Sequence, residues 1–356
     1  VLIDRGESFA MGLRKLWQVV GIGTLAEGRR SRAILRERGI RFLQTEISAI
    51  DPANRAVVTA DGELDGDHLV VALGAEPRPD LVPGLVEHGH DVWSVASVPA
   101  LQQAVAALGS SARGVSAVAV VITGVPYTCP PAPYECVMLL DDHLRERGVR
   151  DRVELTVATL QPLLLPNAGK EGSEWLAEQL TRRQIAYRTA SKTLAVEAGR
   201  VRFENGELPF DLLIGVPPHR VPRVVKESGL TGDGEWVVVD PGTLETPFER
   251  VHAIGDVVQI KLENGMQLPK AGLMAELQGA RVAAAIAARL AGDDPPAPFD
   301  GRGFCFLETG KRSAALIEGH FFASPQPEVV LGDDSEAHAE AKHRFESERL
   351  ERWFGG

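Results

Sequence analysis

Segments with the hydrophobic pattern of strands and of helices alternate along most of the chain. Apolar runs as long as a buried strand lie at 116–123, 153–160 and 210–216, and apolar residues recur at helical spacing at 134–147 and 271–291. The order strand, helix, strand within 116–160 favours a βαβ unit with a parallel sheet. The alternation as a whole predicts an α/β fold of doubly wound layers rather than an antiparallel barrel.

The pattern also indicates how the chain divides into domains. The pattern of strand and helix segments seen in the first part of the chain returns near residue 242. This return predicts a discontinuous first domain formed by 1–111 and 233–300. A second domain, 112–232, is then inserted into the first. From 301 to 356 the pattern changes to edge-type strands followed by a charged helix. We therefore predict two Rossmann-like dinucleotide-binding domains and a small C-terminal α+β region.

The first residues predict a short apolar strand that ends in Asp4. In a dinucleotide-binding domain, an acid at this place accepts hydrogen bonds from ribose hydroxyls, and a simple turn former is the alternative. The glycine loop Gly-x-Gly-x-x-Gly that normally precedes such an acid does not occur in this sequence. We therefore expect the first strand and its glycine loop to have preceded this chain. The glycines at 21–26 follow the acid, and we interpret that segment as a loop.

Composition and charge exclude several classes of protein. A formal net charge of −11 argues against nucleic-acid binding, which needs clustered Lys and Arg. No run approaches the ~18 uninterrupted apolar residues of a membrane span. The chain has three cysteines, too few and too far apart for a disulfide scaffold, and no ligand spacing suggests a metal. Any cysteine chemistry is therefore expected to be redox chemistry.

The charged C-terminal segment, 335–354, is predicted to be a helix with one apolar face. Leu350, Trp353 and Phe354 share that face at i, i+3 and i+4 spacing. We expect the face to pack on the protein's own body or on a partner subunit. Contact with a membrane surface is the alternative.

A stretch near the end of the predicted first domain carries the signature of a flavin site. A buried strand, Val-His-Ala-Ile, stops at Gly255 and Asp256, and the helix that follows begins after Leu-Pro-Lys270. The segment resembles flavoproteins with two dinucleotide domains, and so does Val-Val-Ala-Leu-Gly74-Ala-Glu-Pro. The resemblance implies FAD, with a ribityl hydroxyl on Asp256 and Lys270 at the pyrimidine edge. The N-terminus of the helix would stabilise negative charge on the reduced flavin.

The most distinctive motif is Val-Pro-Tyr-Thr-Cys-Pro-Pro-Ala-Pro-Tyr-Glu at 125–135. It follows the strand of the inserted domain at the turn where NAD(P)H-binding proteins keep a glycine-rich loop. Its prolines remove amide donors that a pyrophosphate would need, and the next strand ends in Gln161 without an acid for a ribose. Both halves of the nucleotide fingerprint are missing, which argues against NAD(P)H.

The same motif resembles that of flavocytochrome c sulfide dehydrogenases and, more broadly, of sulfide:quinone oxidoreductases. The resemblance covers nearly the whole chain and implies a redox-active pair, Cys129 with Cys305. Hydrosulfide would attack their disulfide, leaving a persulfide and a thiolate. It also implies Glu135 as the acid/base that handles protons, and stabilisation of the first helical turn is the alternative role. Cys136 has no counterpart in the motif and is expected to be a small buried hydrophobe.

The resulting functional prediction is an FAD-dependent oxidoreductase that oxidises sulfide and passes electrons to a quinone or to a c-type cytochrome subunit. Two alternatives are kept: a type II NADH:quinone dehydrogenase on the same scaffold, and a flavin-binding scaffold without turnover. The quinone role favours the cytoplasmic side of a membrane, with peripheral contact through the C-terminal region. A signal peptide and a homo-oligomer are left open.

Overall fold

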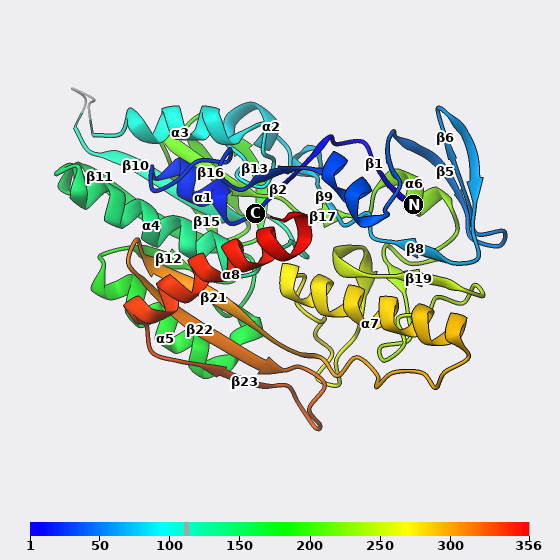
Figure 1. Cartoon of the computed structure of the whole chain (residues 1–356). Coiled ribbons are helices and arrows are strands. Elements are labelled where there is room, and N and C mark those ends of the chain that lie inside the picture. The colour runs from blue at the N-terminus through cyan, green and yellow to red at the C-terminus, as the bar shows by residue number, and fades with distance from the viewer. Residues whose placement is uncertain (110–113, 356) are drawn as a thin grey trace.

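The computed structural model of the chain describes residues 1–109 and 114–355 (Figure 1). The predicted α/β class is observed: parallel strand pairs and a parallel sheet, covered by helices, with smaller antiparallel sheets beside them. The predicted boundary between 111 and 112 lies outside the described residues. The boundaries after 232 and after 300 stay predictions.

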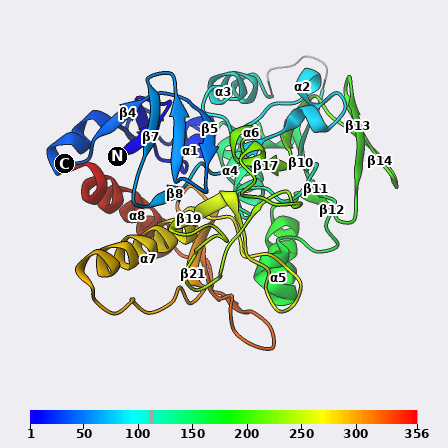
Figure 2. The same ribbon diagram turned by 90° about the vertical axis from the view of Figure 1, so that its right-hand side faces the viewer.

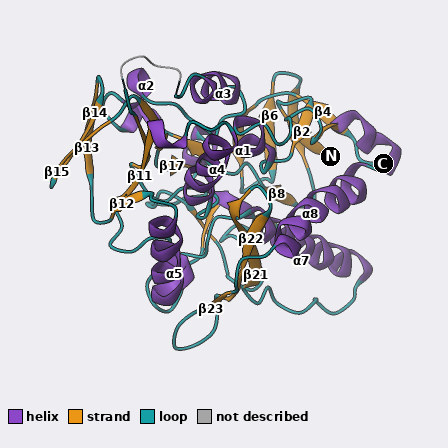
Figure 3. Cartoon of the chain, turned by 90° about the vertical axis from the view of Figure 1, so that its left-hand side faces the viewer, coloured by secondary structure: helices purple, strands orange, loops and turns teal. Residues whose placement is uncertain are grey.

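The predicted inserted domain is built on a four-stranded parallel sheet with the order β12-β11-β10-β16. The strands are β10 (Ser116–Ile122), β11 (Val153–Thr159), β12 (Ala186–Arg188) and β16 (Leu212–Val216). Helix α4 (Ala132–Glu146) connects β10 to β11, and α5 (Gly169–Arg182) connects β11 to β12 (Figure 3). The strand order reverses beside β10, and ligands of such sheets bind outside the carboxyl ends of the strands at this point.

Continuous burial explains why these segments form this layer. Strand β10 has the sequence Ser-Ala-Val-Ala-Val-Val-Ile and is almost entirely buried, as expected for a parallel strand that is covered on both faces. Helix α4 is buried over most of its length because it lies between the parallel sheet and the C-terminal strand β21 (Arg302–Gly310). The helix is thus a shared core element of two parts of the chain.

Short elements complete the inserted part. They are an antiparallel sheet of β13 (Thr193–Glu197), β14 (Arg200–Phe203) and β15 (Gly206–Pro209), and the 3₁₀ turns η3 (Arg150–Arg152) and η4 (Pro166–Ala168). The antiparallel pair β9 (Glu76–Pro77) and β17 (His219–Arg220) joins the chain before this part to the last segment of this part.

The predicted first domain contains three parallel strand pairs, and Figure 2 views the molecule from its side. The pairs are β1 (Leu2–Asp4) with β4 (Phe42–Gln44), β8 (Leu69–Val71) with β19 (Val251–Ala253), and β18 (Val237–Val238) with β20 (Val258–Gln259). The long helix α7 (Gly272–Ala291) contacts the 3₁₀ turn η5 (Gly255–Val257) that follows β19.

Smaller elements surround these pairs. The strands are β2 (Ser8–Ala10), β3 (Arg29–Ser31), β5 (Ile47–Asp51), β6 (Ala56–Thr59) and β7 (Gly62–Asp65). The helices are α1 (Arg14–Val19), α2 (Leu85–His88), α3 (Val98–Ala106) and α6 (Arg223–Glu227), with the 3₁₀ turns η1 (Arg32–Arg38) and η2 (Pro79–Leu81).

The C-terminal region is an antiparallel sheet crossed by a helix. Strands β21, β22 (Ser313–His320) and β23 (Glu328–Leu331) form the sheet, and α8 (Glu336–Phe354) runs back across the molecule (Figure 1). Ser335 caps α8 by accepting a hydrogen bond from His338 N at 3.2 Å.

The apolar face of α8 packs on the N-terminal segment. Leu350 and Phe354 are buried with Met11 and Leu35, and Trp353 packs against this cluster. The prediction that this face docks on the protein's own body is confirmed. Within the described residues, no helix is both long enough and apolar enough to cross a membrane.

Leu139 tests the role of α4 as a shared core element. Its side chain is fully buried, so Leu139→Ala should lower the free energy of unfolding by about 2–5 kcal/mol through lost burial and a cavity. Urea denaturation measures the loss. The matched control is Leu290→Ala on α7, where the side chain is 73% exposed and the change should stay within about 0.5 kcal/mol. Equal losses in the two variants would contradict this assignment of the core.

Candidate active site

The two motif cysteines line one cavity. Its empty space is about 1130 Å³, part of which is open to solvent. The lining comes from segments that are far apart in the chain, and it includes Lys15, Trp93, Cys129, Glu135, Asp256, Lys270, Phe304, Cys305 and Lys342. The structure therefore brings together the residues predicted for catalysis and two of those predicted for the flavin.

Cys129 lies in the loop that follows β10, at the carboxyl end of the parallel sheet. Its backbone has φ of 58°, in the left-handed region that is unfavourable for a residue with a side chain. Two contacts hold this conformation: Cys129 N donates to Lys270 O at 2.7 Å, and Cys129 O accepts from Ala132 N at 3.0 Å. The first contact ties the cysteine loop to the segment that leads into α7. Local strain maintained by surrounding contacts is typical of functional sites.

Cys305 approaches the same cavity from β21. Both thiols are free, and the charge of a Cys305 thiolate would raise the pKa of Cys129, which places the two groups within electrostatic reach of each other. Burial raises the pKa of Cys305 to about 11 and that of Cys129 well above its usual range. The reduced pair is therefore held as thiols near neutral pH, because a thiolate would be poorly solvated.

Glu135 belongs to a buried charge network that the sequence did not reveal. Its carboxylate accepts from Lys342 Nζ at 2.6 Å and from Glu308 N at 2.9 Å. Lys342 Nζ also donates to Glu308 Oε2 at 2.7 Å, and Trp17 Nε1 donates to Glu308 Oε1 at 2.9 Å. Burial raises the pKa of Glu135, and the ammonium of Lys342 opposes that rise. Glu135 is thus neither a free surface carboxylate nor only a first-turn stabiliser of α4.

A sequence signal for Lys342 did exist. Lys342, Glu346 and Leu350 follow one another at i, i+4 and i+8 on α8, and all three are buried. A lysine on the face that carries the apolar residues of a helix needs a buried acidic partner. The partners come from β21 and α4, which only the tertiary structure brings to α8.

Gly255 and Asp256 form the turn after β19 as predicted. Gly255 has φ of 74°, its N–H donates to Gln278 Oε1 at 2.7 Å, and a Cβ there would lie 3.1 Å from Ala275 Cβ. The glycine thus allows the turn to approach α7 closely. The Asp256 carboxylate lines the cavity and accepts no hydrogen bond from the described residues. Burial raises its pKa, the charges of Lys270 and Lys15 oppose that rise, and the carboxylate is open to a hydroxyl donor.

Lys270 is held by backbone groups. Its Nζ donates to Asp256 O at 2.7 Å and to Val258 O at 2.8 Å, and lies 3.6 Å from the ring centroid of Trp236. Burial lowers its pKa to about 8. Its position at a flavin edge stays a prediction.

A third lysine of the cavity, Lys15 on α1, was not predicted from the sequence. Its Nζ donates to Trp93 O at 2.7 Å, and the indole Nε1 of Trp93 donates to Thr128 O at 3.0 Å, next to Cys129. A single lysine in a short helix gives no sequence signal. Only the fold brings it near Cys129 and Asp256.

Asp4 and Gly74 do not line this cavity. Asp4 accepts from Gly6 N at 2.7 Å and pairs with Arg32 at 2.9 Å, the contacts of a turn former. Gly74 has φ of 69° and follows β8, with no heavy atom within 4 Å of the position that a Cβ would take. Their roles in cofactor binding stay predictions.

The residues around the cavity fit a flavin. Asp256 offers an unpartnered acceptor, and Gly272 at the first turn of α7 lines the cavity. Ala271 cannot cap α7 with its side chain, so first-turn N–H groups remain to stabilise negative charge. Among the described residues, no group of three or more His, Cys, Asp or Glu side chains is placed to hold a metal ion.

The loop after β10 gives little room to a pyrophosphate. Among the amides that the prolines leave, Cys129 N is bound to Lys270 O and Thr123 N to Val216 O at 2.9 Å. A Cβ at Gly124 would lie 2.6 Å from Pro218, so this glycine serves close packing. Both observations agree with the sequence argument against NAD(P)H.

Lys342→Ala should be strongly destabilising, because it leaves two buried carboxylates without their cation. We expect the free energy of unfolding at pH 7 to fall by about 3–5 kcal/mol. The control is Lys192→Ala, which removes an exposed pair with Glu204 and should cost below about 1 kcal/mol. Adding Glu135→Gln and Glu308→Gln should recover part of the loss. A cost as small as that of the control would rule out the network as a structural link.

Lys270 should make stability depend on pH. Its folded pKa of about 8 lies below the ordinary value of 10.5, so between these values the unfolded chain binds more protons than the folded one. Stability should therefore rise with pH across this window, by on the order of 3 kcal/mol. Urea titrations from pH 7.5 to 10 should show this rise in wild type and in the exposed control Lys170→Met. The same slope in Lys270→Met would refute the assignment.

The chain is similar to proteins named as sulfide oxidoreductases. It is 29% identical over 255 residues to the mitochondrial sulfide:quinone oxidoreductase of Dictyostelium discoideum, covering 68% of this chain and 56% of that relative. The match with the sulfide-quinone reductase of Aquifex aeolicus is 26% identical over 320 residues, 82% of this chain and 69% of the relative. The chain thus spans little more than half the length of the first relative.

The fold is also that of a solved structure. The chain superimposes on the X-ray structure of the sulfide:quinone oxidoreductase from Aquifex aeolicus with a TM-score of 0.86 at 21% sequence identity. The match covers 100% of this chain and 89% of the Aquifex aeolicus chain. Residues 19–280 match the family model described as pyridine nucleotide-disulphide oxidoreductase. The predicted fold class and the prediction of an FAD-dependent oxidoreductase are thereby confirmed. The chain belongs to the pyridine nucleotide-disulphide oxidoreductase family.

Proposed function

We propose that this protein oxidises sulfide through Cys129 and Cys305 and passes the electrons by way of FAD to a quinone. The observation that carries the proposal is the single cavity that both cysteines share with Asp256. The names of the similar proteins, which are sulfide:quinone oxidoreductases, point in the same direction. The family alone does not specify sulfide, so the cysteine pair and its surroundings carry the argument.

Sulfide oxidation begins with the pair joined as a disulfide. Hydrosulfide attacks one cysteine sulfur, a new S–S bond forms, and the bond between the cysteines breaks. The attacked cysteine becomes a persulfide, and the other leaves as a thiolate that carries the electron pair. The sulfur of sulfide is oxidised by two electrons, and the disulfide is reduced by two.

The cations of the cavity support whichever cysteine leaves as the thiolate. Lys342 lowers the pKa of both cysteines and Lys15 lowers that of Cys129, so both lysines oppose the effect of burial. Glu135 is suited to move protons because its raised pKa brings it closer to neutral pH than an ordinary glutamate. Its hydrogen bond to Lys342 fixes one of its oxygens, so the other can face a proton donor in the cavity.

FAD, when bound, supplies the two-electron acceptor between the cysteine pair and the quinone. Asp256 would accept a hydrogen bond from one of its hydroxyls, the turn at Gly255 would admit it next to α7, and Lys270 would lie at its edge. Asp4 and Gly74 stay candidates for contact with the nucleotide part of the cofactor.

An aromatic wall of the same cavity suits a quinone ring. Phe304, Phe306 and Phe345 line it, and their ring centroids lie 5.6–6.0 Å apart in edge-to-face pairs. Flat apolar headgroups bind well between such rings. A quinone dissolved in lipid implies peripheral contact with a membrane, for which we propose the cytoplasmic side. A c-type cytochrome is the competing acceptor, and a homo-oligomer remains a proposal.

Cysteine variants test the reaction. FAD-loaded wild type, kept anaerobic, should lose flavin absorbance on addition of sulfide and regain it on addition of a short-chain quinone. Cys129→Ser and Cys305→Ser should reduce the flavin only at the background rate. Cys136→Ala is the matched control and should behave as wild type, because this thiol is buried within α4.

Three other results would each overturn part of the proposal. Bleaching that persists unchanged in Cys129→Ser would remove the cysteine mechanism. Bleaching by NADH at a rate similar to that by sulfide would favour the NADH dehydrogenase alternative. Reoxidation by a c-type cytochrome but not by the quinone would replace the acceptor.

A further inference from the structure

Trp236 lies against the ammonium of Lys270, and nothing in the proposed reaction uses this tryptophan. It directly precedes β18, whose pairing with β20 sets Val237 opposite Val258. Lys270 Nζ lies 3.6 Å from the centroid of the indole ring, and Trp236 is only 4% exposed. The electron-rich face of an aromatic ring attracts a cation, and tryptophan provides the most favourable ring. The contact therefore stabilises the ammonium and is more than simple packing.

The other partners of this ammonium are also neutral. Lys270 Nζ donates to the backbone oxygens of Asp256 and Val258, at 2.7 and 2.8 Å. Within the described residues Lys270 makes no ion pair, whereas Lys342 in the same cavity is held between two carboxylates. Two carbonyl oxygens and one ring thus hold the cation without cancelling its charge. We call this set, Trp236 with the backbone oxygens of Asp256 and Val258, the lysine cage.

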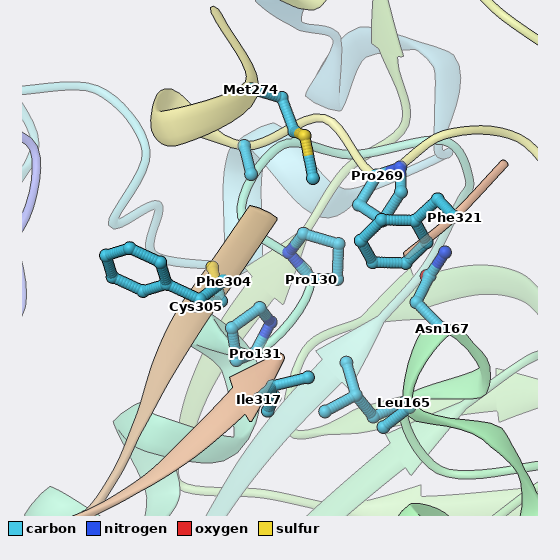
Figure 4. A pocket seen from close by; sticks show the side chains of 12 residues that line it. Pro130, Pro131, Leu165, Asn167, Pro269, Met274, Phe304, Cys305, Ile317 and Phe321 are labelled. Atoms are coloured by element: carbon cyan, nitrogen blue, oxygen red, sulfur yellow. The ribbon is translucent and has the colours of Figure 1, made fainter. Parts of the chain in front are cut away.

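The surroundings of the lysine cage compensate the charge only in part. The carboxylate of Asp256 on η5 favours the ammonium, but burial outweighs it and lowers the pKa of Lys270 to about 8. His219 on β17 is neutral near pH 7, because burial lowers its pKa to about 4. Pro269 and Met274 line a second cavity on this segment, and its lining among the described residues includes no charged side chain (Figure 4).

We propose that Trp236 is a positioning residue that keeps Lys270 protonated at the start of α7, so that the large cavity retains a positive charge that no ion pair cancels. The inference rests on the proposed flavin site and deepens it, because it names the residue that maintains the charge at the predicted flavin edge. A carboxylate in place of the ring would also hold the ammonium, but it would cancel the charge. The ring leaves that charge available to an anionic occupant.

The charge of Lys270 bears on the redox chemistry of the site. Negative charge that develops on a bound flavin is stabilised by a neighbouring cation, and an uncharged amine stabilises it less. A protonated Lys270 should therefore raise the midpoint potential of the flavin. Trp236 is not among the residues that line the large cavity, so it acts on this potential only through Lys270.

The first test measures the titration of Lys270 in the full chain without cofactor. The protein carries carbon-13-labelled lysine, NMR follows the lysine signals from pH 6 to 10, and the signal that Lys270→Arg lacks identifies the residue. Trp236→Phe keeps an aromatic face, and Trp236→Met has a side chain of similar size without one. We expect a small fall of the Lys270 pKa in the Phe variant and a fall by about one in the Met variant, a roughly tenfold loss of proton affinity.

Trp175→Met is the matched control, because Trp175 on α5 is a partly buried tryptophan with no cation over its ring among the described residues. It should leave the pKa of Lys270 unchanged. If Trp236→Met does not fold, a fluorinated tryptophan analogue built into the wild-type chain decides, since fluorine weakens the negative ring face and almost preserves the shape. The analogue should also lower the pKa. Equal pKa values in the Phe and Met variants, or no change with the analogue, would overturn the proposal.

The second test uses the chain loaded with FAD. The midpoint potential of Trp236→Met should equal that of wild type at pH 6, where Lys270 is protonated in both, and should fall increasingly below it as the pH rises to 8. A difference of the same size at every pH would indicate a purely structural effect and would refute the role of Trp236. Failure of the proposed sulfide oxidation would show separately, as a flavin that sulfide does not bleach while the titration of Lys270 still responds to Trp236.

Discussion

The buried ammonium of Lys342 is the interaction on which the candidate site depends. It lies between the carboxylates of Glu135 and Glu308, so helix α8, helix α4 and strand β21 meet at one point. Burying one cation and two anions is costly unless each has partners, and the indole of Trp17 adds a hydrogen bond from α1. This requirement fixes the geometry of three segments that carry or support Cys129 and Cys305.

The position of Cys129 follows from two constraints that act on one short loop. Strand β10 delivers the loop to the reversal point of the parallel sheet, and the hydrogen bond from Cys129 N to Lys270 O ties it to the start of α7. Where relatives that bind nicotinamide nucleotides use free amides of this loop, here prolines and internal hydrogen bonds occupy them. The loop that binds a phosphate in nicotinamide-binding proteins thus places a thiol beside Asp256 and Lys270 here.

Burial dominates the electrostatics of both cysteines. It raises the pKa of Cys305 to about 11 and that of Cys129 further, although Lys342 opposes the rise at both sulfurs and Lys15 opposes it at Cys129. A thiolate released from the disulfide is therefore partly compensated by cations at either sulfur.

The sequence by itself determined the local chemistry of this protein. The alternation of strand and helix patterns predicted the α/β fold, the proline-rich motif made Cys129 and Glu135 candidates for catalysis, and the strand that stops at Asp256 predicted a turn for a flavin. These signals are local, since each depends on residue types within one element. The pairing of Lys342 with Glu135, the approach of Lys15 and the cavity that Cys305 shares with Cys129 were decided only by the tertiary structure. Such contacts join residues more than a hundred positions apart, and no periodicity within one segment encodes which buried charges will meet.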